Sequence, residues 1–221
     1  METRETKIKK ARIHTVYKTQ DGGRVPSVTT ILGILAKPAL IEWAWKLGTE
    51  GINYKQVRDQ AGDVGSLAHY LILCDIKGEK PDTSEYSAKV IDKAETCLLK
   101  YWEWRKTNPI RPIMVEEALV SEQYRYGGTL DCFAEREDTG EFVLIDFKTG
   151  KAIYEEAIIQ VVSYAHLIKE NGYDVNTVKI LRIGRDANEG FEERTIYDFE
   201  TGWQIFLRCL DIYNLKKVLK S

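Results

Sequence analysis

Residues 127–150 read GGTLDCFAEREDTGEFVLIDFKTG, and the architecture expected for the chain follows from this stretch. Two runs of strand-forming residues flank the short polar turn DTGE, so the stretch is predicted to form two antiparallel neighbouring strands. Asp131 lies a few residues into the first strand, and Asp146 lies near the end of the second. Lys148 follows two residues later and therefore shares a face with Asp146. The hairpin gathers two carboxylates and one ammonium group.

Strands and helices are expected on both sides of this hairpin. Before it, the pattern predicts a short strand at 12–18, a helix start within 25–37, helices at 38–51, 55–75 and 84–106, and a strand at 113–122. After it, the pattern predicts a helix at 153–172, strands at 178–184 and 191–199, and a helix at 201–220. The fold class is therefore α/β, with a mixed β-sheet flanked by helices. An N-terminal helical wall or arch (1–108) precedes the βββαββα core (109–221), in one compact domain.

The composition limits the class of protein. The chain has 221 residues, of which 43% are hydrophobic and 30% charged, as in ordinary globular proteins. A net charge of −2 gives no overall signal for nucleic acid, although a local basic groove is compatible with it. The sequence contains neither an 18-residue apolar run nor the apolar segment of a signal peptide. We therefore expect no membrane association and a cytoplasmic location, in a bacterial or phage-infected cell.

The four cysteines are widely spaced along the chain: Cys74, Cys97, Cys132 and Cys209. No CxxC pair is present to fix the geometry of a zinc or iron–sulfur site. We expect reduced thiols in or near the core and no iron–sulfur cluster.

Two carboxylates that face one point repel each other unless a positive group lies between them. A hard divalent cation such as Mg²⁺ suits the paired Asp131 and Asp146, because it takes oxygen ligands and keeps several waters. Such a cation activates water and stabilises charge on phosphate, and Lys148 is placed to orient that water or to neutralise charge. This chemistry is phosphodiester hydrolysis. The simpler alternative is a surface carboxylate pair with a salt-bridged lysine.

The ordered motifs resemble the PD-(D/E)XK nuclease superfamily, and within it the RecB-like exonuclease branch. That branch carries an aspartate on one strand, D/E-x-K on the next and Q-x-x-x-Y on the following helix. It also carries an upstream G-x-x-x-H element. The matching residues here are Asp131, Asp146, Lys148, Gln160, Tyr164, Gly65 and His69. The PSVTTIL segment is similar to phage and mitochondrial genome maintenance exonucleases, and the likeness spans residues 25–195. One departure is Leu130, which replaces a proline.

The resemblance implies a restriction-endonuclease-like core and a set of site residues. Asp131 and Asp146 would hold Mg²⁺ or Mn²⁺, with His69 and Glu116 assisting. Glu117 is the alternative to Glu116 should a bulge change the register. The catalytic set implied is Asp131, Asp146, Lys148, Gln160 and Tyr164. Gln160 and Tyr164 share one helical face, so Tyr164 has the alternative of simply packing.

A nucleic-acid surface is expected beside this site. The residues predicted to contact DNA are Ser27, Arg24, Lys151, Tyr126 and Arg185, with Arg182 as a further basic residue near the cluster. Trp43 and Trp45 are candidates for stacking on bases, although the apolar residues of the same helix favour a core position for Trp43.

The function expected is a metal-dependent DNA exonuclease that favours linear single-stranded or tailed DNA, in recombination, repair or phage DNA processing. A recombination or replication protein is an expected partner. Two alternatives stay open: a structure-specific or restriction-type endonuclease, and a catalytically silent nucleic-acid-binding module.

Overall fold

A computed structural model describes residues 15–186 and 188–219 of the chain. The N-terminal part contains β1 (Tyr17–Lys18), β2 (Arg24–Val25), α1 (Val28–Leu32), α2 (Pro38–Thr49), α3 (Tyr54–Lys77) and α4 (Ala88–Thr107). The remainder contains β3 (Ile110–Ser121), β4 (Tyr126–Arg136), β5 (Phe142–Lys148), α5 (Glu155–Glu170), β6 (Thr177–Ile183), β7 (Phe191–Ile196) and α6 (Phe199–Val218). Within the described ranges, no helix is both long and apolar enough to cross a membrane.

The main sheet is five-stranded and mixed, with the order β3-β4-β5-β6-β7. All neighbouring strands are antiparallel except β5 and β6, which are parallel and are joined through helix α5. A parallel pair needs such a crossover, whereas the antiparallel pairs need only turns. The predicted α/β class, with a mixed sheet flanked by helices, is confirmed and agrees with a restriction-endonuclease-like core.

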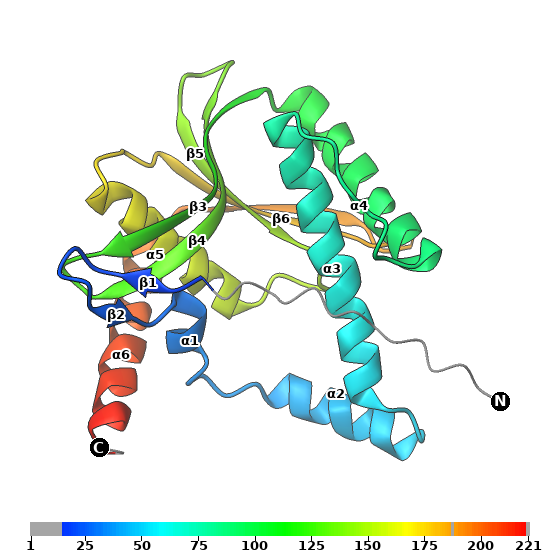
Figure 1. Cartoon of the computed structure of the whole chain (residues 1–221), viewed down its shortest axis with the longest axis horizontal. Helices are drawn as coiled ribbons and strands as arrows, with labels where there is room; N and C mark the ends of the chain where they lie inside the picture. Colours follow the sequence, from blue (N-terminus) through cyan, green and yellow to red (C-terminus); the bar gives the residue numbers. More distant parts are fainter. Residues whose placement is uncertain (1–14, 187, 220–221) are drawn as a thin grey trace.

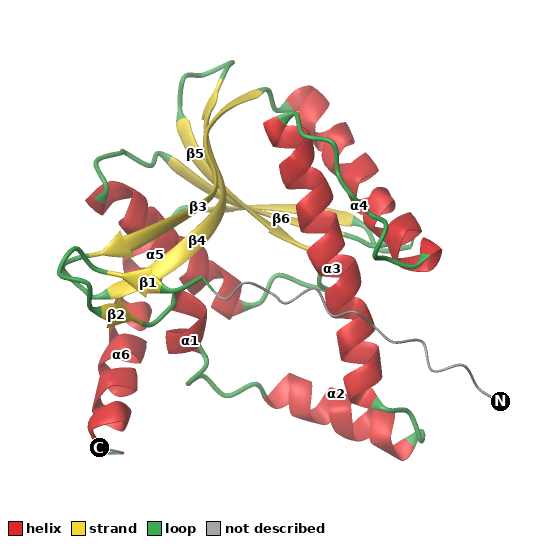
Figure 2. Cartoon of the chain, in the orientation of Figure 1, coloured by secondary structure: helices red, strands yellow, loops and turns green. Residues whose placement is uncertain are grey.

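Two hydrophobic cores lie on the two faces of the sheet. Helices α1, α5 and α6 pack on one face, and helices α3 and α4 pack on the other (Figures 1 and 2). Alternation along β5 assigns its residues to the two faces: Leu144 joins the α5 core, whereas Val143, Ile145 and Phe147 join the α3 core. Because Asp146 and Lys148 have the parity of Leu144, they belong to the α5 face.

Helix α2 differs from the expectation for its aromatic residues. None of its side chains is buried, and Trp45 is 70% exposed. Trp43 is only half-buried and meets Tyr54 edge-on, with ring centroids 6.4 Å apart, so the predicted core position of Trp43 is wrong. Figure 1 shows α2 away from the sheet, joined back to it through α1 at one end and α3 at the other. Apolar composition predicted the helix but not its exposure.

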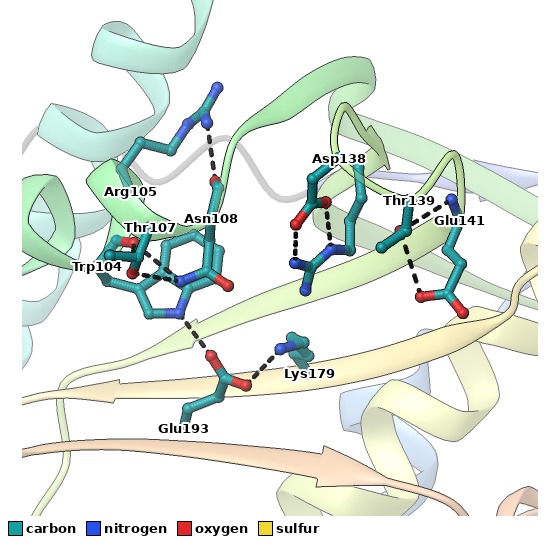
Figure 3. Close-up of polar contacts among 10 residues, drawn as sticks. Trp104, Arg105, Thr107, Asn108, Asp138, Thr139, Glu141, Lys179 and Glu193 are labelled. Carbon is teal, nitrogen blue, oxygen red and sulfur yellow. Dashed lines mark hydrogen bonds and ion pairs between the residues drawn. The ribbon is translucent and has the colours of Figure 1, made fainter.

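Helix α4 is held on the sheet by a partly buried polar network (Figure 3). Glu193 on β7 pairs with Lys179 on β6 and also accepts a hydrogen bond of 2.6 Å from Trp104 Nε1. Both carboxylate oxygens of Glu193 are therefore engaged, and the buried ammonium of Lys179 has a counter-charge. The four cysteines are buried free thiols, as expected.

Candidate active site

The site lies where β4 and β5 separate. Their paired ladder runs from Glu135–Phe142 to Cys132–Ile145 and ends there. Asp131 and Asp146 are the next residues on the two strands, so both carboxylates stand at the fork between them. Residues from helices on both faces of the sheet approach this point, because no strand pairing closes it.

Asp146 and Lys148 form an ion pair at the end of β5. Oδ2 of Asp146 lies 2.6 Å from Lys148 Nζ. Within the described part of the chain, the Lys148 ammonium is the one polar partner of this buried oxygen. The Asp146 side chain is 2% exposed, whereas that of Lys148 is 27% exposed. One ammonium neutralises one carboxylate, so the second nearby carboxylate, Asp131, leaves room for a further positive group at the fork.

Asp131 is held by a strand amide and by a histidine from the opposite face. Its Oδ2 accepts a hydrogen bond of 2.8 Å from the backbone N–H of Phe147 and lies 3.6 Å from Nδ1 of His69. The His69 ring also meets the Phe147 ring edge-on, with centroids 6.2 Å apart. The predicted meeting of Asp131, Asp146, Lys148 and His69 is thus present in the fold, with each carboxylate facing one basic side chain.

The pKa values of the two carboxyl groups shift in opposite directions. Burial raises the pKa of Asp146 to about 6, against the lowering effect of Lys148 and with further raising by Asp131. Burial also acts to raise the pKa of Asp131, but His69, Lys148 and the Phe147 amide outweigh it and lower this pKa below its ordinary value. Neighbouring acids whose pKa values are shifted apart in this way are typical of catalytic pairs.

Both basic groups favour their charged forms. Burial acts to lower the pKa of Lys148, but Asp146 and Asp131 outweigh it, and the net pKa is raised. Burial likewise opposes the charge on His69, but Asp131 raises its pKa above the ordinary value. Lys148 is therefore an ammonium at neutral pH, which suits charge stabilisation and excludes proton abstraction by the resting side chain.

Gln160 and Tyr164 of α5 interact as the i, i+4 spacing predicts. Gln160 Nε2 donates to the Tyr164 hydroxyl at 2.7 Å. Burial raises the pKa of Tyr164, and the charges of Asp146 and Asp131 raise it further, so the phenol stays protonated beside the site. The Tyr164 ring lies against Gly128 of β4, where any Cβ would overlap the ring. This explains in physical terms why glycine precedes the TLD segment.

The glycine of the G-x-x-x-H element also has a packing role. A Cβ on Gly65 would lie 2.8 Å from Oγ1 of Thr149, in the loop that follows β5. Glycine thus lets α3 approach the end of β5 closely, and His69 lies one helical turn further along the same helix.

Glu116 has a different partner from the one expected. It adopts a positive φ of 55°, and its carboxylate forms an ion pair of 3.0 Å with Lys77 at the end of α3. Its side chain is 57% exposed. A role for Glu116 in holding a metal remains a prediction, while Glu117 is also exposed.

The residues predicted to contact DNA are dispersed. Ser27 caps α1 by accepting from Thr30 N, Arg24 and Lys151 are exposed, and Arg185 is paired with Glu189. Tyr126 is fully buried and donates its hydroxyl to the Ser163 carbonyl. Its side chain is therefore inaccessible to DNA, and the predicted contact is corrected.

Sequence reasoning missed Tyr17. This residue of β1 reaches across to β4, where its hydroxyl lies 2.8 Å from Thr129 Oγ1, two residues before Asp131. No local motif pointed to it, because its place depends on a contact between residues 112 positions apart.

The donor set fits a hard divalent cation bound mainly by water and substrate. Within residues 15–186 and 188–219, no group of three or more His, Cys, Asp or Glu side chains is arranged to hold a metal. Mg²⁺, however, is commonly bound through one or two carboxylates plus waters and phosphate oxygens. Asp131 and Asp146 supply two such carboxylates.

Comparisons with known proteins give distant likenesses. No family model and no curated protein sequence match the chain. One similar solved structure is a candidate exonuclease from Eubacterium rectale, with 12% identity and a TM-score of 0.44, over 71% of this chain and 66% of that one. The chain thus spans just under two thirds of that protein. Another is SSO0001, with 16% identity and a TM-score of 0.30, over 59% and 68%. Similarity this low assigns no function, so the functional argument rests on the site.

Proposed function

We propose that the chain is a metal-dependent deoxyribonuclease that hydrolyses phosphodiester bonds at DNA ends. The observation that carries the proposal is the pair of neighbouring carboxylates at the fork: Asp146 is buried and lies 2.6 Å from the Lys148 ammonium, and Asp131 acts on it as a second negative charge. Two neighbouring carboxylates can bind a divalent metal, and the nearby lysine ammonium can stabilise negative charge on a phosphate. Together these groups suit hydrolysis of an anionic substrate.

Asp131 and Asp146 would hold Mg²⁺ or Mn²⁺, which supplies Lewis-acid stabilisation of phosphate charge and activation of water. Asp131 is fixed for this role by the Phe147 amide, and Asp146 by burial within the sheet. Lys148, charged and partly exposed, stabilises the negative charge that develops on the phosphate and orients the attacking water. His69 supports Asp131 from the α3 side.

The α5 residues would contribute hydrogen bonds rather than acid–base chemistry. Tyr164 stays protonated, and Gln160 donates to it, so the pair offers a fixed polar surface beside the carboxylates. We infer that Gln160 orients the substrate phosphate or the lysine. Proposed partners are linear single-stranded or tailed DNA and a recombination or replication protein, in the cytoplasm of a bacterial or phage-infected cell.

The direct test is digestion of an end-labelled single-stranded oligonucleotide with Mg²⁺, Mn²⁺ or EDTA. We expect cleavage only with a divalent cation, and a loss of at least about 100-fold in Asp146→Ala. The matched control is Asp211→Ala, which removes an exposed helical aspartate paired with Arg208. Residual activity of Asp146→Ala within threefold of wild type would refute the assignment.

Lys148→Ala separates the roles of the two groups. We expect a loss of roughly 100-fold in kcat at saturating metal, because the ammonium acts on the charge of the transition state. Metal titration of each variant is the measurement. A defect that excess metal restores would mean that Lys148 supports metal binding instead.

Two alternative functions remain, and each predicts a different result. A restriction-type or structure-specific endonuclease would cut covalently closed DNA. A silent nucleic-acid-binding module would bind DNA without cleaving it under any metal condition.

A further inference from the structure

Arg182 lies beside Lys148 at the same end of the sheet. Strands β5 and β6 are parallel, and their register pairs Lys148 with Arg182. Ile180 belongs to the α5 core, so Arg182, two residues later, lies on the same face as Lys148. This is the carboxyl end of the parallel pair, the edge at which α/β sheets bind ligands.

Two ion pairs lie at this end of the sheet. Asp146 and Lys148 form one ion pair on β5, and Arg182 of β6 pairs with Glu192 of β7 at 3.0 Å. Lys148 and Arg182 are therefore neighbours across the parallel pair, and each has one carboxylate partner. An anion bound at this edge would face both cations, because residues in register on parallel neighbours project from the same face.

The Arg182–Glu192 pair also differs from the second ion pair on the same strands. Lys179 and Glu193, on the opposite face, are locked by a third partner, Trp104 (Figure 3). Arg182 contacts Glu192 through Nε alone, and no second side chain within the described ranges hydrogen-bonds Glu192. The Arg182 side chain is 12% exposed and that of Glu192 is 44% exposed. The Arg182 guanidinium is thus held by one hydrogen bond through Nε, which leaves its Nη donors for a further acceptor.

We infer that Arg182 is a phosphate-binding residue of this site, and that Glu192 holds its guanidinium until a phosphodiester oxygen takes its place. The inference rests on the proposed function, because its substrate is the DNA backbone. Arg182 would bind a phosphate that also faces Lys148, so the two cations position the strand over the carboxylates. A guanidinium suits this task because its planar fork of donors matches phosphate oxygens.

The test is binding of a fluorescent single-stranded oligonucleotide in EDTA, where no cleavage occurs, over a series of salt concentrations. We expect Arg182→Gln to weaken binding about 5- to 30-fold and to reduce the slope of log K against log salt by about 0.7, the value for one lost single-strand phosphate contact. Arg182→Lys should keep the slope and lose part of the affinity.

Glu192→Gln distinguishes phosphate binding from a structural ion pair. It frees Arg182, so binding should be equal to or tighter than in wild type, whereas loss of a structural pair would make it weaken binding as Arg182→Gln does. The matched control is Arg111→Gln, which removes a cross-strand arginine–glutamate pair between β3 and β4. It should leave affinity within twofold and the slope unchanged.

Three results would overturn the inference: an unchanged salt slope in Arg182→Gln, parallel losses in Glu192→Gln and Arg182→Gln, or no measurable binding by the wild-type protein. Failure of the proposed function looks different, because it is the absence of divalent-dependent cleavage by wild type. A protein that binds with the expected slopes but does not cleave would retain the Arg182 assignment alone.

Discussion

Asp146 is a carboxylate whose surroundings oppose its charge. Burial raises its pKa to about 6, although Lys148 lies against it. An acid whose folded-state pKa exceeds its unfolded value binds the proton more tightly when folded. Its contribution to stability is therefore greatest below about pH 4 and is lost as the pH rises through about 6. Ionisation of Asp146 at neutral pH therefore lowers the free energy of unfolding of the metal-free protein.

Asp146→Asn should remove that effect. In metal-free buffer at pH 8 we expect the variant to be more stable than wild type, on the order of 2 to 3 kcal/mol, since each pKa unit corresponds to about 1.4 kcal/mol. At pH 4 the two proteins should differ little, because Asp146 is then protonated. Thermal unfolding of both proteins at the two pH values is the measurement. A stability difference that is the same at both pH values would show that the carboxylate charge is not its source.

The sequence predicted which residues form the site better than it predicted the tertiary contacts that those residues make. Asp131, Asp146 and Lys148 could be predicted to meet, because strand alternation and a short turn fix their positions. The pairing of Glu116 with Lys77 could not, since it depends on a positive φ within β3. Tyr17 escaped notice for a similar reason, because only the folded chain brings β1 beside Thr129.

At the scale of elements, the contact between α3 and the end of β5 positions His69. Gly65 leaves room for Thr149 Oγ1, which is the one atom within 4 Å of the Cβ position in the described structure outside the local chain. The helix approaches the strand at this point because it lacks a side chain there. The depth of this contact sets the distance between His69 and Asp131.

Gly65→Ala should reduce activity about threefold or more without the stabilisation that alanine usually gives a helix. The matched control is Gly48→Ala in α2, where a Cβ meets nothing within 4 Å and where we expect a gain of up to about 1 kcal/mol. Adding Thr149→Ala to Gly65→Ala removes the clashing oxygen and should restore activity. The measurements are thermal unfolding and initial cleavage rates. Full activity of Gly65→Ala alone would contradict the positioning role.

Most helices and strands were predictable because the apolar residues in each follow a pattern typical of one type of secondary structure. The strands β5 and β6 are short runs rich in apolar and β-branched residues, and α3, α4 and α5 carry apolar residues at helical spacing. Helix α2 shows the limit of this reasoning, because its apolar residues resemble those of a packed helix although none of them is buried. Burial depends on what the rest of the chain places nearby, and the local sequence does not record it.

For the whole molecule, the N-terminal segment passes from one face of the sheet to the other. Helix α1 belongs to the α5 core, α3 belongs to the opposite core, and α2 connects them outside both. Lys37, at the start of α2, forms an ion pair of 2.9 Å with Glu156 of α5. Glu156 lies in the first turn of α5, a few residues after the end of β5, so this ion pair attaches the start of α2 on the side of the sheet where β5 ends.

We expect a DNA strand to reach the site by passing between α2 and the end of the sheet, and only a strand with a free end can thread through such a passage. We expect linear single-stranded DNA to be degraded at least tenfold faster than the same oligonucleotide closed into a circle, and faster than blunt duplex. The assay is a time course on the linear and circular forms with Mg²⁺, and a shared binding measurement controls for affinity. Equal loss of both forms would show that no end is needed and would favour an endonuclease.

The hydrogen bond from Phe147 N–H to Asp131 gives the site a built-in spectroscopic reporter. Its acceptor is a side-chain carboxylate, at 2.8 Å, beyond the last paired residues of β4 and β5. Protonation of Asp131, or its capture by a cation, would withdraw electron density from that oxygen and shift the amide resonance of Phe147. In a ¹⁵N-labelled sample, one peak would then follow the occupancy of the site, with neither substrate nor turnover required.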